Sequence, residues 1–464
     1  MKQNLVSLVD ATKLIAVLAS LTGIVLVSSP LWLNDPDLIQ AAGIVIFSVV
    51  LWATGAIPLH VTALIMFLTA TVLEIAPTNV VFAGFHASAT WLVFGGLVIT
   101  IAVNKSGLAN RAVNTLVEVL PAKYFAMALG IAFAGVLLAF IMPSASARAV
   151  LMAPLAMTLS DNLGFKRNTP ARFGLIIAAG MGSTIPAFGI LPSTVVTMAF
   201  AGVAESLHGV TFSYFEYLLL NFPILGMTGL LIQTALITVI FGSKPNTIRE
   251  IKTTYNWSFE ERRLLTILLI ALALWMSDAL HGISPAWVAL AAALVCITPG
   301  IGLLKSKVLT EEINYGPWLF IAGVIGMGAI TSHTGLGKAI GSFLLSNLPL
   351  SENGGIVTFY QIFAIGALIN LISTAPIVAP IMTAFADSIA LSTNWPIKSI
   401  LLAEVPSFMI FPFPHQAPPV AITMALGGVP MKEGAKILVI YFVIALLVLM
   451  PLQYFWGKLI GAYP

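Results

Sequence analysis

Hydroxyl and amide side chains cluster at four points where prolines interrupt strongly apolar sequence. The four stretches are PSASAR (143–148), GILPST (189–194), LINLISTAP (368–376) and HQAPPV (415–420). They carry the neutral oxygen donors Ser144, Ser146, Ser193, Thr194, Asn370, Ser373, Thr374 and Gln416. Such oxygens suit a hard monovalent cation and can also hydrogen-bond the oxygens of an anion. For any single Ser or Thr, packing between close helices is the alternative role.

Ionisable side chains are few in these stretches, and Arg148 is the most informative of them. A guanidinium in apolar sequence needs a partner, which is either a substrate anion or a set of helix-end carbonyls, unless it reaches the cytoplasmic face. His415 could donate to an anion or serve as a packing residue. Glu404 and the pair Asp161/Asp387 are the main acids nearby, and no span contains a chain of carboxylates. A dedicated proton relay is therefore not expected.

Composition indicates a polytopic membrane protein. Of 464 residues, 59% are hydrophobic and 8% are charged, whereas a soluble domain has about 25% charged residues. The single cysteine, Cys296, excludes an internal disulfide framework and a cysteine metal cluster. Neither a His-Glu-x-x-His pair nor a Gly-x-Ser-x-Gly elbow occurs, so we expect no enzymatic activity.

Apolar runs of membrane-spanning length define the predicted elements. About eleven spans are expected, near 13–33, 39–57, 60–75, 88–104, 173–204, 216–241, 264–281, 284–303, 317–331, 399–427 and 434–456. Two further apolar stretches, 124–160 and 356–390, are interrupted near their centres and are predicted to be re-entrant helical hairpins. With this topology most of the 21 lysines and arginines lie inside, which predicts a cytoplasmic N-terminus.

The sequence also repeats itself. WLVFGGLVITIAVNKSGL (91–108) resembles WLFIAGVIGMGAITSHTGL (318–336), and LPSTVVTMAF (191–200) resembles APPVAITMAL (417–426). We expect scaffold helices at 1–87 and 264–316, repeat units at 88–241 and 317–464, and a cytoplasmic linker at 242–263. An odd number of crossings separates the copies, so the repeats are predicted to be inverted. Inverted repeats with helices broken at matching positions indicate an alternating-access transporter.

With these motifs the chain resembles the divalent anion–sodium symporter family, in particular its di-/tricarboxylate and sulfate transporters. Ser144, Ala145 and Ser146 stand on the Ser-Asn-Thr positions of that family's hairpin tip, and GILPST resembles its Thr-Pro-Pro-Asn loop. QAPPVAI resembles the second such loop, with Val420 in place of asparagine. At the second tip the motif falls either on Ser373-Thr374 or, by the repeat offset, on Asn370.

The resemblance implies which residues bind substrate and sodium. The implied substrate ligands are Ser144, Ala145, Ser146, Arg148, Pro192, Ser193, Ser373, Thr374, Pro418 and Pro419. The implied Na⁺ ligands are Ser144, Ala145, Gly189, Asn370, Ser373 and Ala417. It further implies a homodimer, with the helices after SGL and TGL lying at the membrane surface as arms around a moving core.

The sequence therefore predicts an inner-membrane secondary transporter of a small oxyanion, coupled to Na⁺ and moving by an elevator mechanism. Na⁺-independent anion exchange and an anion channel are the alternatives. No organic cofactor is expected. A nucleic-acid partner is not expected either, because acids and bases alternate in the 242–263 linker.

Overall fold

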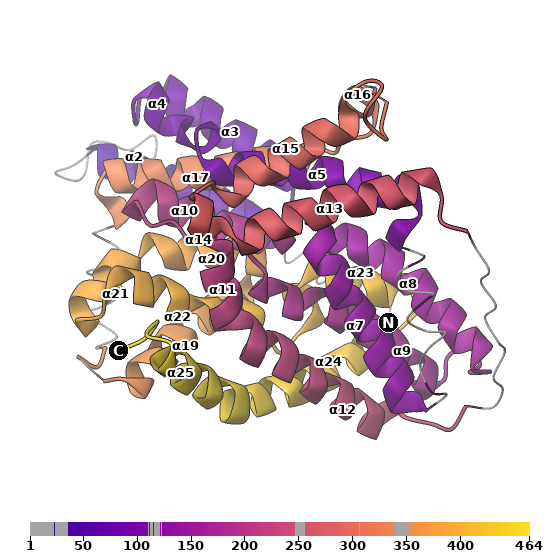
Figure 1. Cartoon of the computed structure of the whole chain (residues 1–464). Helices are drawn as coiled ribbons and strands as arrows, with labels where there is room; N and C mark the ends of the chain where they lie inside the picture. Colours follow the sequence, from indigo (N-terminus) through magenta and orange to yellow (C-terminus); the bar gives the residue numbers. More distant parts are fainter. Residues whose placement is uncertain are drawn as a thin grey trace. The chain divides into compact units, whose positions relative to one another are not determined.

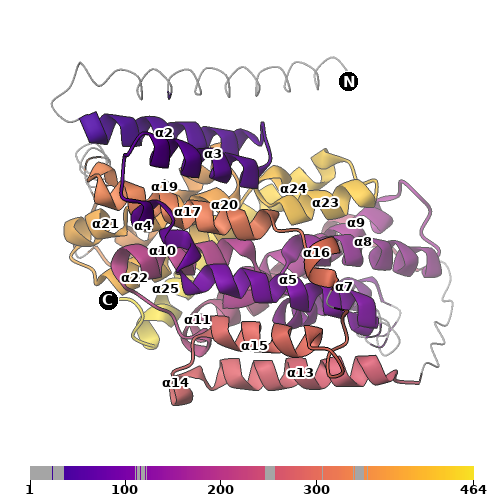
Figure 2. The ribbon, with the colours of Figure 1, turned by 90° about the horizontal axis from the view of Figure 1, so that it is seen from above.

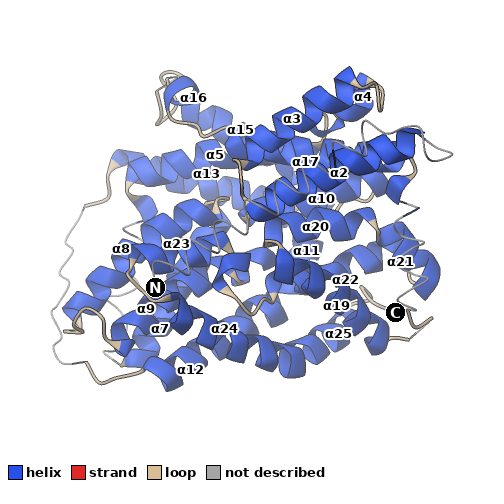
Figure 3. Cartoon of the chain, turned by 180° about the vertical axis from the view of Figure 1, so that it is seen from behind, coloured by secondary structure: helices blue, strands red, loops and turns tan. Residues whose placement is uncertain are grey.

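The computed structural model describes residues 23, 36–109, 111, 115, 121, 123–245, 256–305, 307–337, 339, 350–352 and 354–464. Helices and turns, without a strand, make up this part of the chain (Figure 3). The predicted all-α fold is thus confirmed there. Most of the predicted first span, the two arms after SGL and TGL, and the centre of the linker lie outside the described residues.

Apolar helices long enough to cross a membrane recur along the chain, which supports a multi-pass membrane protein. Within a bilayer the backbone must satisfy its own hydrogen bonds, so apolar runs of this length form helices. Five segments meet this length and composition, namely Ser88–Ser106, Tyr124–Ile141, Pro170–Gly189, Tyr214–Phe241 and Met431–Leu459, among the residues described. A bent pair, α20 (Ala375–Ala384) and α21 (Ala386–Thr393), would make a sixth. The number of about eleven crossings and the re-entrant hairpins stay predictions.

The described chain divides into two compact units, each built from several segments. Unit 1 contains residues 1–91, 198–211 and 314–404. In it α3 (Leu59–Val72) packs between α2 (Pro36–Thr54) and α17 (Gly316–His333), as Figure 2 shows at the top of the view. The rings of Trp52 and Phe320 meet edge to face with centroids 5.4 Å apart. The unit also holds α19 (Ile356–Ile372), α20, α21 and parts of α10 (Val195–His208) and α22 (Ile397–Met409).

Unit 2 contains residues 92–197, 212–313 and 405–464. Its centre is α9 (Pro170–Thr184), which packs against α7 (Tyr124–Ile141), α8 (Ala145–Asn162), α12 (Gly229–Phe241) and α23 (Pro418–Leu426). Figure 1 shows these helices side by side. All but two residues of α9, Pro170 and Phe173, are buried. The unit therefore brings the predicted first hairpin next to helices that flank both predicted breaks.

Small residues allow α7 and α9 to approach closely. A methyl group placed on Gly182 would lie 2.5 Å from the Cα of Ala132, and one on Gly135 would lie 2.7 Å from the Cα of Ser183. Contacts this short are not compatible with a side chain at either glycine. Close packing of small residues is the usual way that membrane helices associate.

The order of elements in the second half of the chain repeats that in the first. Each half has two helices joined by a short interruption, then a broken helix, then a long helix with a π-helical segment. The π segments are Phe222–Thr228, between α11 (Tyr214–Asn221) and α12, and Ala445–Leu449, between α24 (Met431–Ile444) and α25 (Met450–Leu459). The bounds of the repeat units and their inverted orientation stay predictions.

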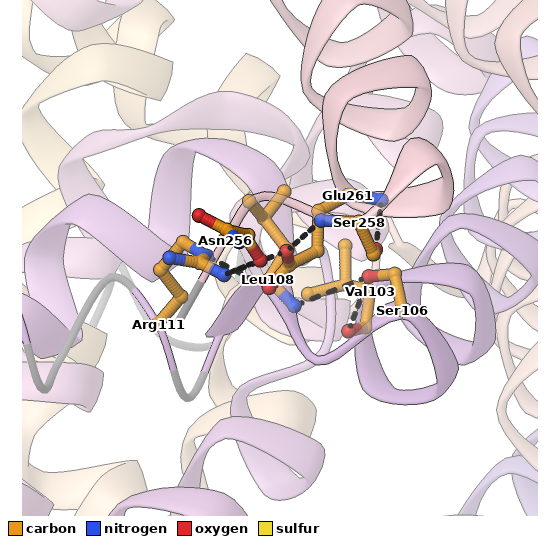
Figure 4. Close-up of polar contacts among 7 residues, drawn as sticks. All are labelled: Val103, Ser106, Leu108, Arg111, Asn256, Ser258 and Glu261. Carbon is orange, nitrogen blue, oxygen red and sulfur yellow. Dashed lines mark hydrogen bonds and ion pairs between the residues drawn. The ribbon is translucent and has the colours of Figure 1, made fainter. Parts of the chain in front are cut away.

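An ion pair joins the segment after α5 (Ser88–Ser106) to the start of α13 (Phe259–Met276), as Figure 4 shows. Arg111 donates from Nε to Oε1 of Glu261 at 2.8 Å and from Nη2 to Oε2 at 2.9 Å, and its guanidinium covers the ring of Trp257. Glu261 also accepts from the backbone N–H of Ser258, and this reciprocal pair forms a capping box. The C-terminal end of the linker is thereby attached to the segment after α5.

We predict that Gly182→Ala destabilises the protein by about 1–3 kcal/mol, because the added methyl group overlaps the backbone of α7. Thermal unfolding in detergent measures this. Gly337→Ala is the control, because the nearest atom to a methyl group there, Cγ2 of Thr331, is 3.6 Å away. Equal unfolding temperatures for the two variants would contradict the close α7–α9 packing.

We also predict that the Arg111–Glu261 attachment weakens in acid. Hydrogen bonds from Arg111 hold the pKa of the Glu261 carboxyl below its ordinary value. The stabilisation is therefore complete above the ordinary carboxyl pKa of about 4.3 and is lost as the pH falls through the lowered value. Unfolding temperature measured against pH should show an acid-side decline that is smaller in Glu261→Gln. The exposed neighbour variant Glu260→Gln should keep the wild-type profile, and a decline unchanged in Glu261→Gln would exclude this ion pair as its source.

Candidate functional site

The first predicted tip is a short turn between two buried helices. Residues Met142–Ser144 join α7 to α8, and Ser144 is the N-cap of α8, where its Oγ accepts from the N–H of Ala147 at 3.3 Å. Ala145 is buried, Ser144 is half-buried and Ser146 is exposed. The two hydroxyls therefore lie at the N-terminal end of α8, where the helix dipole is positive.

The first break separates α9 from α10 and consists of two short 3₁₀ turns, Pro186–Gly189 and Leu191–Ser193. Pro186 and Pro192 have no N–H to donate, so a continuous α-helix cannot form here. Thr194 begins the second half, because its Oγ1 accepts from the N–H of Thr197 at 3.1 Å. Thr194 thus serves as a helix cap, while Gly189, Pro192 and Ser193 are buried within the break.

Arg148 connects the tip to the break. Its side chain is fully buried, and Nε donates to the carbonyl of Ser183 at 3.1 Å. Nη1 donates to the carbonyl of Ser193 at 3.0 Å and also to that of Met142. One guanidinium therefore donates hydrogen bonds to backbone carbonyls of the hairpin tip, the end of α9 and the break. The sequence suggested either a substrate anion or helix-end carbonyls as the partner of Arg148, and the structure shows carbonyls.

Three polar atoms around this junction have no hydrogen-bond partner among the described residues. They are Nη2 of Arg148, Oγ of Ser193 and Oγ1 of Thr184, all buried. A buried polar group without a partner costs about 1–3 kcal/mol. One donor and two hydroxyls around one break are a suitable environment for a small charged or polar ligand. Thr184 was missed from the sequence, although its position directly before Ile-Pro marked the end of a helix.

The second broken helix contributes to the same unit. Its turn, Pro414–Gln416, follows α22 and precedes α23, which packs on α8 and α9. Oε1 of Gln416 accepts from the N–H of Phe413 at 2.8 Å, so this amide stabilises the turn. His415 is exposed and its ring stacks on that of Phe413. Ala417 and Val420 are buried, whereas Pro418 and Pro419 at the start of α23 are half-buried.

The second predicted tip belongs to unit 1. Helix α19 ends at Ile372 and α20 begins at Ala375, so Ser373 and Thr374 form the interruption. The Ser373 hydroxyl donates to the carbonyl of Ile369 at 2.7 Å. Asn370 lies one turn earlier, buried in the last turn of α19. Ser373-Thr374 therefore occupies the place in the second hairpin that Pro143-Ser144 occupies in the first.

The two aspartates that the repeat pairs make different contacts. Asp161 pairs with Arg172 at the entry to α9. Asp387 lies with its Oδ2 3.2 Å from Nδ1 of His208, at the C-terminal end of α10. Both are surface carboxylates that connect neighbouring helices, as expected for residues near hairpin ends.

The site chemistry is that of neutral oxygens and one fixed cation. Within unit 2 the fold collects Ser144, Ala145, Ser146, Arg148, Gly189, Pro192, Ser193 and the Ala417–Pro419 segment. Ser373, Thr374 and Asn370 belong to unit 1. No group of three His, Cys, Asp or Glu side chains able to hold a metal ion occurs among the described residues. Hydroxyls and freed carbonyls at helix ends can coordinate Na⁺, while helix N-termini and the guanidinium attract anions. Which residues bind stays a prediction.

Comparison with known proteins finds a matching family and several similar transporters. The model of a family described as the sodium:sulfate symporter transmembrane region matches residues 8–463. An uncharacterized transporter of Haemophilus influenzae is 24% identical over 452 residues, covering 91% of this chain and 93% of the relative. The sodium-dependent dicarboxylate transporter SdcS of Staphylococcus saprophyticus is 21% identical, covering 88% and 85%. The solved YdaH transporter of Alcanivorax borkumensis has a TM-score of 0.50 at 17% identity, over 82% of this chain and 86% of that one, and is similar in fold.

We predict that Arg148→Lys lowers the unfolding temperature even without substrate. Lysine carries a compact charge and lacks the planar fork that reaches three carbonyls, and each lost hydrogen bond to a charged donor is worth about 1.5–3 kcal/mol. Thermal unfolding in detergent is the measurement, with the exposed Arg262→Lys as control. If Arg148→Lys unfolds like wild type and loses only transport, the guanidinium acts on the substrate alone.

Proposed function

The chain belongs to the sodium:sulfate symporter family, and we propose that it transports a small dicarboxylate-like oxyanion together with Na⁺. A transporter of this family is a multi-pass membrane protein, and the apolar helices described above agree with that. The dicarboxylate class is supported by the similarity to sodium-dependent dicarboxylate transporters such as SdcS, which match most of the chain at low identity. Sulfate is the alternative substrate, because the family description names it.

The junction of the first tip with the first break is the observation on which the proposal depends. There Arg148, in the first turns of α8, donates to carbonyls of the tip and of the break, and the buried hydroxyls of Ser193 and Thr184 have no partner among the described residues. Cations bound by the hydroxyls and carbonyls would offset the charge of the anion, so each ligand favours the binding of the other. This mutual compensation is the physical basis of symport in the proposal.

One feature favours a second mode of coupling. Arg148 already places a fixed positive charge against three carbonyls at the junction. A tethered cation can compensate an anion without Na⁺, which would suit an exchanger that swaps one anion for another. Anion exchange is therefore the alternative that the experiment below must separate from symport.

The proposal also includes the membrane location, the dimer, the inverted repeats and the elevator movement that the sequence predicts. We place the protein in the inner membrane with a cytoplasmic N-terminus, as a homodimer of two inverted repeat units, 88–241 and 317–464. An elevator movement would carry the two hairpins and broken helices past the scaffold helices.

Uptake into proteoliposomes tests the coupling. Labelled succinate, citrate and sulfate are supplied with and without an inward Na⁺ gradient, and with and without internal anion. Saturable uptake that depends on inward Na⁺ supports the proposal. Uptake that requires an internal anion and ignores Na⁺ would establish exchange, and a current that does not saturate would establish a channel.

We predict that Ser144→Ala and Ser146→Ala each weaken uptake at least about fivefold, because loss of one ligand costs about 1 kcal/mol or more. Ser160→Ala is the matched control, since the Ser160 hydroxyl donates within its own helix to the carbonyl of Ala156 at 2.7 Å. Ser144→Thr keeps both the hydroxyl and the N-cap and should retain activity. Equal effects of all three alanine substitutions would remove the assignment of this tip.

A further inference from the structure

A cluster of titratable side chains surrounds Thr383 near the end of α20 in unit 1. Glu404 of α22, His208 of α10 and Asp387 of α21 take part, and no site described above includes Glu404 or His208. Glu404 is fully buried, and the His208 side chain is 2% exposed. Buried ionisable groups in a membrane protein are costly and for that reason are functional candidates.

The hydroxyl of Thr383 indicates the state of Glu404. This hydroxyl has one proton and lies 2.8 Å from the carbonyl of Ala379, which can only accept. A helical threonine commonly donates to the carbonyl four residues earlier. Oε2 of Glu404, 3.3 Å from the same oxygen, then fits as the donor of a hydrogen bond rather than as a second acceptor. The contact is satisfied when the carboxyl group carries a proton.

The carbonyl of Thr383 indicates the state of His208 by the same reasoning. Nε2 of His208 lies 2.7 Å from this carbonyl oxygen, so Nε2 carries a hydrogen. Nδ1 lies 3.2 Å from Oδ2 of Asp387 but makes no hydrogen bond there. A proton added at Nδ1 would lie next to this carboxylate oxygen, so the geometry of the pair can accommodate one. The C-terminal end of α20, to which Nε2 donates, also favours a positive charge.

The other titratable groups on the surrounding helices are Glu205 on α10, His333 at the end of α17, Tyr360 on α19 and Lys398 on α22. The carboxylate of Glu205 accepts from the Ser88 hydroxyl at 2.5 Å. Helix α2, which also packs on α20, has no titratable side chain from Leu38 to Thr54. Of these titratable groups, Glu404 and His208 have a hydrogen bond with Thr383, and Asp387 lies next to His208.

We propose that these residues form a proton-binding site in the second hairpin, which holds protons while α20 packs on α10 and α22. When the second hairpin opens and α20 separates from α10 and α22, a movement additional to the elevator movement, Glu404 and the His208–Asp387 pair become exposed. They then release protons to water through the Asp387 side, whose side chain is 68% exposed. Proton binding then stabilises the arrangement in which α20 packs on α10 and α22, because these groups bind protons more tightly there than when they are exposed to water. For transport, this inference rests on the proposed function and adds proton dependence to it.

Infrared spectroscopy of the purified protein tests the site without any transport. A protonated carboxyl group has a C=O stretching band that shifts in D₂O, whereas carboxylates and amides absorb elsewhere. At neutral pH the wild type should show such a band, and Glu404→Gln should lose it. Glu352→Gln, which removes an exposed carboxyl group of unit 1, should keep the band. Identical spectra for wild type and Glu404→Gln would overturn the proposal.

The pH profile of uptake provides the second measurement. Wild-type uptake should change with pH, Glu404→Gln should lose most of that change, and His208→Gln should shift its midpoint because the imidazole no longer titrates. Profiles of both variants that coincide with wild type would contradict proton coupling. If Glu404→Gln carries no substrate, the infrared result decides. Failure of Na⁺-driven uptake in the wild type would remove the proposed function and leave the infrared test intact.

Discussion

The structure depends on how backbone groups are satisfied where helices break inside apolar surroundings. A continuous helix consumes its own N–H and C=O groups, but each interruption frees several of them, and hydrocarbon offers no water to replace the lost partner. In unit 2 the break at 185–194 lies beside the turn at 142–144, and Arg148 donates to carbonyls of both segments and of α9. A single cationic side chain therefore makes it possible for a tip and a break to share one buried junction.

In unit 1 a helix end is contacted by side chains that can bind protons, and not by a side chain with a fixed charge. Near the end of α20, Glu404 and His208 contact Thr383, and Asp387 lies next to His208. We propose above that these side chains bind protons there. A guanidinium stays charged, whereas carboxyl and imidazole groups change charge with their surroundings. The two units thus differ in what they can respond to: one holds a constant positive charge, and the other can gain or lose protons.

The interruptions could be located from the sequence because a proline removes a backbone donor and breaks a helix locally. The breaks at GILPST and HQAPPV and the turn before Ala145 are helix interruptions in the structure. It was less informative about what each polar side chain does. Thr194 and Gln416 stabilise local turns, and Thr184, which was not singled out, has a buried hydroxyl without a partner at the break.

The sequence by itself determined that the chain is a helical membrane protein, where its helices break, and which family it resembles. These follow from composition, helix-breaking residues and motif spacing, all of which are local properties. Only the tertiary structure decided that Arg148 binds carbonyls of three segments and that Glu404 meets Thr383 across 21 residues of sequence. It also placed Ser373 and Thr374 at the second interruption. The reason is that packing of the helices determines which groups a buried polar side chain contacts. These groups can lie far apart along the chain, and no sequence pattern indicates that they will meet.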